Sequence, residues 1–155
     1  MFRSLLLCGL LLSGCSLLFP PPPEPVKREP INNAPGAPEA IGPYSQAIRV
    51  GNALYCSGQI AINPATGDLI IGDAKEEARQ ALKNLGAVLQ AAGMGFDNAV
   101  KVTVFLTNIN DYKIVNEAYQ EFFKEPYPAR EAVQVAQLPG NAKVEISCIA
   151  IKTDL

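Results

Sequence analysis

The sequence predicts an α+β domain with the element order β-β-α-β-α-β-β, in which one sheet carries both helices on the same face. Three observations lead to this fold class. A Gly-Asn pair between two strand-like runs indicates a hairpin, helical periodicity occurs twice further along the chain, and two more strand-like runs close the sequence. The chain has 155 residues, which is enough for one domain of ordinary size after the N-terminal segment is set aside.

The expected hairpin joins residues 44–50 to residues 53–59. Between these runs lie Gly51 and Asn52, a dipeptide suited to a two-residue hairpin turn. The later elements are expected as strands at 99–107, 130–136 and 143–152 and a helix at 111–123.

The first helix is expected to start at Asp73. Glu76 follows Asp73 at capping-box spacing, and Gly93 provides a residue suited to ending a helix. Between them, one apolar face recurs at helical spacing. Its residues are Ala78, Leu82, Leu85, Leu89 and Ala92.

The last strand has two different faces. Successive strand side chains point to opposite sides of a sheet. Glu145, Ser147, Ile149 and Ile151 therefore share one face, opposite Val144, Ile146, Cys148 and Ala150. With both helices on one side, an apolar pair on the other side is a candidate subunit interface. The alternative is a second layer of loops, which so short a chain can hardly supply.

The composition restricts the chemistry. The net charge is −2, so the chain lacks the basic excess that is typical of nucleic-acid-binding proteins. The chain contains no histidine, which excludes His-based triads, His zinc sites and imidazole proton transfer. Phosphate-binding glycine motifs are absent from the sequence as well. We therefore expect no metal and no cofactor.

The N-terminus resembles a bacterial lipoprotein signal peptide over residues 1–15. Arg3 precedes the apolar segment 5–12, and Leu-Ser-Gly ends at Cys15 in the pattern of a lipobox. The alternative is an ordinary cleaved signal peptide with a chance cysteine. We expect a lipid anchor on Cys15, and Ser16 favours sorting to the outer membrane, facing the periplasm of a Gram-negative cell envelope.

A proline-rich tether is expected at residues 16–39, followed by the domain at 40–155. Cys56 and Cys148 lie in apolar strand-like runs. We expect both to be buried thiols, although export would make a disulfide chemically possible.

Arg130 is the first candidate site residue. It follows Pro128-Ala129 and opens an apolar run that is expected to be buried, and a buried guanidinium needs an anionic partner. That partner is either a ligand carboxylate or a protein carboxylate. Charge pattern alone favours a structural ion pair with Glu145 or Glu131.

Four short motifs favour a ligand carboxylate as the partner of Arg130. Together they resemble the RidA family of enamine/imine deaminases, also called YjgF or L-PSP. The resemblance extends from about residue 40 to 152. The motifs are Ile41-Gly42-Pro43-Tyr44-Ser45-Gln46-Ala47, Ser57-Gly58-Gln59-Ile60, Pro128-Ala129-Arg130 and Val144-Glu145-Ile146.

The resemblance implies a chorismate-mutase-like fold and a homotrimer with active sites between subunits. It also implies hydrolysis of 2-enamine and 2-imino acids, such as 2-aminoacrylate, 2-iminopropanoate and 2-iminobutanoate, to 2-oxo acids and ammonia. The catalytic residues implied are Arg130 and Glu145, and the substrate-binding residues are Tyr44, Ser57, Gly58, Asn116, Arg130 and the backbone at Ala132.

Two departures from the family pattern keep other functions open. Many members carry cysteine where this chain has Ala132, and most are cytosolic. A trimeric module that binds small carboxylates or a partner without turnover is therefore the alternative. Ribonuclease activity is a third possibility and the least favoured one. The sequence indicates no basic groove, no histidine and no metal ligands with which to cleave RNA.

Overall fold

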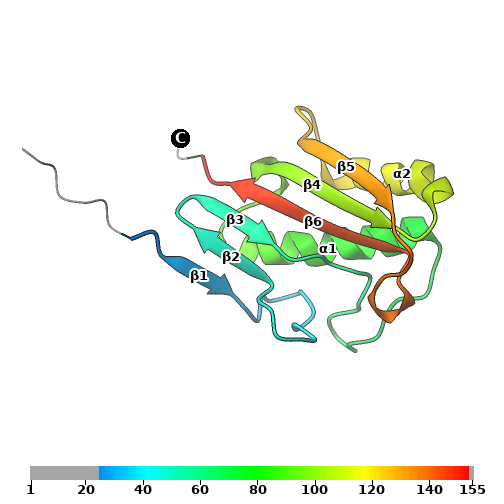
Figure 1. Ribbon diagram of the computed structural model, residues 1–155, viewed down its shortest axis with the longest axis horizontal. Helices are drawn as coiled ribbons and strands as arrows, with labels where there is room; N and C mark the ends of the chain where they lie inside the picture. Colours follow the sequence, from blue (N-terminus) through cyan, green and yellow to red (C-terminus); the bar gives the residue numbers. More distant parts are fainter. Residues whose placement is uncertain (1–24, 154–155) are drawn as a thin grey trace, which may run out of the picture.

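The computed structural model describes residues 25–153. They form one six-stranded mixed sheet with the strand order β1-β2-β3-β6-β4-β5. Both helices lie behind this sheet in Figure 1, so the predicted α+β arrangement is confirmed. The elements are β1 (Arg28–Ile31), β2 (Ala47–Val50), β3 (Ala53–Cys56), α1 (Ala74–Ala91), β4 (Ala99–Leu106), α2 (Tyr112–Phe122), β5 (Ala129–Gln134) and β6 (Val144–Ile151), with 3-10 turns at Phe96–Asn98, Ile109–Asp111 and Pro139–Asn141.

The sequence signals for the hairpin and the first helix are confirmed. Gly51 adopts a φ of 60° at the turn between β2 and β3, a conformation that glycine tolerates without a Cβ clash. The Asp73 side chain accepts a hydrogen bond from the Glu76 backbone N–H, and the Glu76 side chain accepts one from the Asp73 N–H. This reciprocal capping box fixes where α1 begins.

Strand β1 was not expected, because it lies inside the segment 16–39 that its prolines predict to be a tether. Its four residues pair antiparallel with β2, with Pro30 opposite Ile48. A proline is compatible with a strand at the edge of a sheet, where one side of the backbone needs no partner. The domain therefore begins before residue 40.

The core lies between the sheet and α1. On β6, Val144, Ile146, Cys148 and Ala150 are buried against the helices, whereas the four residues between them are partly exposed. This confirms the predicted alternation. Neither helix among residues 25–153 is long and apolar enough to cross a membrane.

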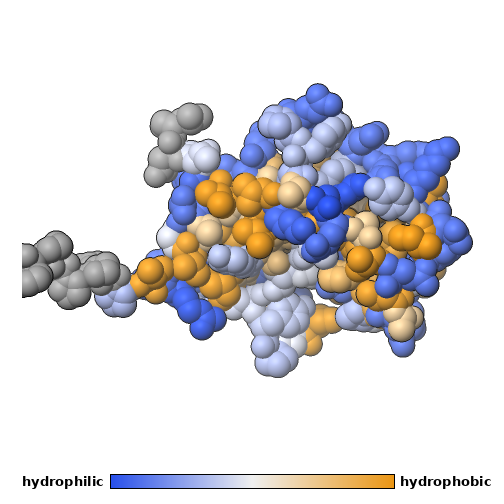
Figure 2. Space-filling model, turned by 45° about the horizontal axis from the view of Figure 1, so that its top comes forward, coloured by the Kyte–Doolittle hydropathy of each residue, from blue (hydrophilic) through white to orange (hydrophobic). Residues whose placement is uncertain are grey.

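The other face of the sheet carries apolar residues that no helix covers. Tyr55 is 50% exposed there, and the register places it between Ile48 and Ile149. Figure 2 shows apolar residues on the surface over the β2–β3 hairpin and the end of β6. A small cluster of Ile60, Leu138 and Ala142 packs with Phe105 at one end of this face. Most of the face is therefore open to another chain.

We predict that a chain shortened to residues 40–155 is less stable than one spanning 25–155. The shorter chain lacks β1 and both hydrogen-bond partners of Gln46, the Ala34 N–H and the Pro38 carbonyl. Leaving a buried amide unpaired costs about 1–3 kcal/mol, so the melting temperature should fall by about 5–15 °C. Equal melting temperatures in thermal unfolding would show that β1 is not part of the domain.

Candidate active site

Arg130 lies on the edge strand β5, where it lines a cavity of about 750 Å³ beneath α2. Its Nη2 donates a hydrogen bond to the Tyr112 hydroxyl at 2.9 Å. The guanidinium carbon lies 4.6 Å from the centre of the Tyr119 ring and 5.5 Å from that of Tyr112. These contacts hold the guanidinium in place by cation–π attraction, and no carboxylate within residues 25–153 forms an ion pair with it.

Two buried polar atoms in this cavity have no partner among the described residues. They are Asn116 Oδ1 and the Tyr119 hydroxyl oxygen. Burial raises the pKa of Tyr119 to about 12, so its hydroxyl stays protonated and can donate. The Asn116 side chain and Arg130 lower the pKa of Tyr112. Unpaired buried polar groups are unfavourable, so the cavity suits a ligand that carries both an anion and a donor.

Glu145 lies in a second cavity, of about 370 Å³, together with Tyr44, Ser57 and Gly58. Burial raises the pKa of the Glu145 carboxyl, because a partly dry surrounding favours the neutral form. The Ser57 hydroxyl is held by the Ser45 carbonyl, to which it donates at 2.7 Å.

Gly58 allows the Glu145 carboxyl to approach the backbone. A Cβ built on Gly58 would overlap the Glu145 carboxylate and lie 2.6 Å from its Cδ. A larger residue at this position would therefore have to displace the Glu145 side chain.

A β-bulge brings Ser57 and Gly58 to this cavity. Tyr55 lies opposite Ile149, but Gln59 lies opposite Ile146, so β3 and its extension contain one residue more than β6 over this stretch. Such an extra residue bends the strand and redirects its side chains. The bulge therefore sets the direction in which residues 57–60 point, and the alternation of strand side chains alone does not predict this direction.

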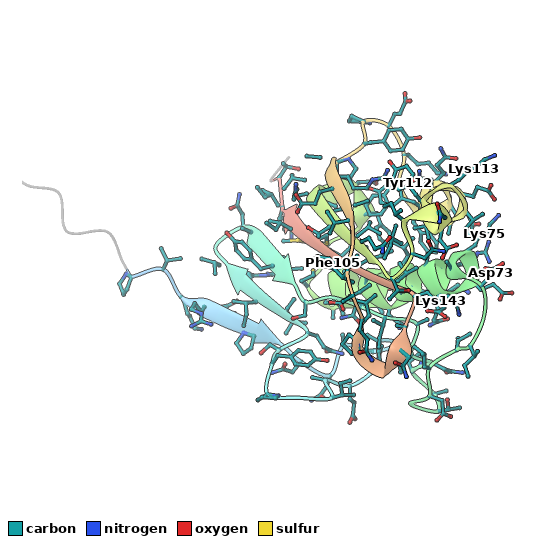
Figure 3. The ribbon with its side chains drawn as sticks, turned by 45° about the vertical axis from the view of Figure 1, so that its right-hand side comes forward. Asp73, Lys75, Phe105, Tyr112, Lys113 and Lys143 are labelled. Atoms are coloured by element: carbon teal, nitrogen blue, oxygen red, sulfur yellow. The ribbon has the colours of Figure 1, made fainter. Side chains whose placement is uncertain are left out.

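Arg130 and Glu145 point to opposite faces of the sheet. Arg130 is in register with Val102, and Val102 is in register with Cys148, which belongs to the covered face. Glu145 is three residues from Cys148 on the same strand, so it belongs to the open face. In Figure 3, Tyr112 lies at α2 and marks the Arg130 side, while Phe105, the register partner of Glu145, marks the other.

The expected structural ion pair of Arg130 is therefore wrong for a single chain. Glu145 is on the other face, and Glu131 instead pairs with Lys101 at 3.0 Å and accepts a hydrogen bond from Thr103. The expectation that the run after Arg130 is buried is also wrong. Strand β5 is an edge strand, and Val133 is 44% exposed.

The predicted site residues thus fall into two groups. Asn116, Arg130 and Ala132 line the first cavity, and Tyr44, Ser57, Gly58 and Glu145 line the second. Sequence reasoning did not identify Tyr112 and Tyr119, because aromatic residues on a helix are most often only core residues. No cluster of three or more possible metal ligands occurs between residues 25 and 153.

Buried polar side chains hold the loops around the second cavity. Gln46 accepts from the Ala34 N–H and donates to the Pro38 carbonyl, which fixes the loop that leads to Tyr44. On the other side, Asn84 donates to the Ile60 and Ile62 carbonyls. Both amides are almost fully buried, a position that polar residues occupy when hydrogen bonds hold them there. Their presence in otherwise apolar stretches was the available sequence signal.

A third polar contact fixes the start of β6. The buried Glu77 carboxylate accepts from the Lys143 backbone N–H at 2.7 Å and from its Nζ at 3.0 Å. Figure 3 shows Lys143 beside the beginning of α1. Because Lys143 is two residues before Glu145, this contact helps to set the position of the Glu145 backbone.

Residues 34–152 match the sequence family described as Endoribonuclease L-PSP. The chain belongs to this family. The human protein named 2-iminobutanoate/2-iminopropanoate deaminase is 53% identical over 119 residues, which cover 77% of this chain and 87% of the human protein. Thus the RidA resemblance noted in the sequence is confirmed at the level of the family.

Solved structures of the family share the fold. RidA from an Antarctic Psychrobacter has a TM-score of 0.77 and 43% identity, covering 80% of this chain and 99% of its own. Escherichia coli TdcF with bound serine has a TM-score of 0.75 and 41% identity, covering 81% of this chain and 100% of its own.

We predict that Gly58→Ala disables the second cavity without unfolding the domain. The added methyl group must displace the Glu145 carboxyl, because the backbone at Gly58 cannot easily move. The next residue, Gln59, forms a β-bridge with Ile146. Turnover of an L-PSP family substrate should fall by about 10²-fold or more. Gly95→Ala is the control for adding a methyl group, because Gly95 has open space around it and an ordinary backbone φ of −140°. Unchanged turnover in Gly58→Ala would contradict the close approach.

Proposed function

We propose that this protein hydrolyses reactive 2-enamine and 2-imino acids to 2-oxo acids and ammonia. The observation that carries the proposal is an Arg130 guanidinium held by two tyrosines and free of any carboxylate in the part of the chain described. Relatives at about half identity bear the name 2-iminobutanoate/2-iminopropanoate deaminase. The TdcF structure has serine bound, and serine carries the same α-carboxylate as these substrates.

Substrate binding begins at the carboxylate. Arg130 offers two parallel N–H donors to it, which supplies orientation as well as affinity. Asn116 Oδ1 is left free to accept a hydrogen bond from the N–H of the imine. The imine carbon is then presented to water without the help of an imidazole.

Hydrolysis needs water held on one face of that carbon. The Glu145 carboxylate can orient the water and accept its proton, with a backbone carbonyl near Ala132 as a second acceptor. Addition of water to the C=N bond gives a carbinolamine. Transfer of the proton to nitrogen and cleavage of the C–N bond then release ammonia and leave the 2-oxo acid.

We propose that the two cavities meet between subunits of a homotrimer. Within one chain, the sheet separates Arg130 from Glu145. The open face with Tyr55 and Ile149 offers apolar surface for association, and cyclic symmetry would repeat the same contact at each boundary. Sedimentation of the 25–155 chain should give a trimer at micromolar concentration, and a monomer would contradict both the interface and the shared site.

Substitutions of Arg130 and Glu145 should remove turnover while leaving the fold intact. Arg130→Ala should abolish 2-iminobutanoate hydrolysis, and Arg130→Lys should restore little, because an ammonium group lacks the planar fork. Glu145→Gln should retain binding but slow turnover by about 10²–10⁴-fold, since an amide cannot accept the proton. The measurement is a paired assay of hydrolysis and thermal unfolding on each variant.

Glu131→Gln is the matched control for this assay. It removes a carboxylate next to Arg130 in the sequence that is paired with Lys101 instead, so turnover should stay near that of the wild type. Normal hydrolysis in Arg130→Ala or Glu145→Gln would defeat the assignment of that residue. If the wild-type protein binds 2-oxobutanoate but never hydrolyses the imine, the protein is a carboxylate-binding module.

We also propose that the chain is a lipoprotein of the cell envelope, anchored by a lipid on Cys15. This proposal rests on the sequence, because residues 1–15 lie outside the described part of the structure. Labelled fatty acid should be incorporated into the full chain and not into Cys15→Ala. Labelling of the Cys15→Ala variant would contradict it.

A further inference from the structure

Two cysteines that the proposed reaction does not use lie next to each other in the centre of the sheet. The register of β3 and β6 pairs Tyr55 with Ile149, and Cys56 and Cys148 are the next residues of these two strands. Both are free thiols on the covered face, with exposed fractions of 8% and 3%.

Cysteines in such positions on neighbouring antiparallel strands can form a disulfide. Residues directly opposite each other on antiparallel strands have Cα atoms about 4.5 or 5.5 Å apart, depending on the hydrogen-bond pattern. Disulfides span Cα separations of about 4.4–6.8 Å, so either spacing is acceptable. The side chains also interact, because the neighbouring Cys148 thiol and burial both raise the pKa of the Cys56 thiol.

We propose that Cys56 and Cys148 are a modification site, which an oxidising compartment converts to an intrachain disulfide. The oxidant is a disulfide-bearing thiol compound or protein. One cysteine thiolate attacks the oxidant disulfide and releases its first thiol, which leaves a mixed disulfide on the chain. The second cysteine thiolate then attacks the sulfur of the first cysteine and releases the second thiol, so the oxidant gains both electrons and both protons.

The bond should form while the chain folds and not afterwards. A raised thiol pKa and burial keep the reactive thiolate scarce in the folded domain. Once formed, the bond joins two central strands that are far apart in the sequence, which restricts the unfolded chain strongly. It also fixes the end of β3 immediately before Ser57 and Gly58, and it lies three residues from Glu145. This inference is independent of the proposed reaction.

The test is refolding of the full chain in a mixture of reduced and oxidised glutathione, followed by alkylation of free thiols. Trypsin is expected to release Cys56 in the peptide 50–75 and Cys148 in the peptide 144–152. Without reduction, we expect these two peptides to be joined, with a mass two hydrogens below their sum. The oxidised protein should melt about 10 °C above the reduced protein, and Cys148→Ala should show no such difference.

Two results would overturn the proposal. One is recovery of both peptides as separate alkylated species from protein that has refolded with oxidised glutathione. The other is a joined pair that melts below the reduced protein, because that would mean the bond distorts the sheet. Both readings come from the wild-type chain and do not depend on how well the Cys148→Ala variant folds.

Discussion

The two-residue repeat of strand β6 is the constraint on which the rest of this molecule depends. β6 lies between β3 and β4, so its position sets the register of the central sheet. Its even-numbered residues are buried under the helices, and its odd-numbered residues face the open side. Glu145 must therefore face away from the helices. Arg130, in the register row of Cys148, must face toward them. A single chain therefore cannot bring the Glu145 carboxyl and the Arg130 guanidinium together.

The polar contacts inside the domain serve this arrangement. Gln46, Asn84 and Glu77 are buried. Each forms hydrogen bonds with backbone groups of segments that lead to the Glu145 cavity. Such contacts specify one loop position because any other leaves a buried polar group unpaired. On the Arg130 side, aromatic rings have the same role. They position a cation without neutralising it, so the charge remains available to a ligand.

Local signals in the sequence predicted much of the fold. The capping box at Asp73, the turn at Gly51 and the alternation on β6 each depend on neighbouring residues, and all three were correct. Strand β1 was missed because its only visible signal, Pro30, argues against a strand unless its edge position is known. The same lack of long-range information hid that β5 is an edge strand.

The sequence predicted residues that line two cavities, but it did not predict how these cavities are arranged. The family motifs pointed to residues that do line the two cavities, including Tyr44 and Asn116. These residues form two separate groups because of the way the strands pair. None of the short motifs contains information on strand pairing. The bulge at Ser57 and Gly58 is a further case, because one extra residue changes the side to which everything after it points.

Subunit complementation tests the central claim most directly. Arg130→Ala is expected to be inactive alone and Glu145→Gln to be slowed by about 10²–10⁴-fold. The two variants are unfolded together, refolded as a mixture and assayed for 2-iminobutanoate hydrolysis. If each site takes Arg130 from one subunit and Glu145 from the next, about one quarter of the sites in randomly mixed trimers regain both residues, and activity returns to a comparable fraction. Mixed oligomers that stay as inactive as the two parents would contradict a site shared between subunits.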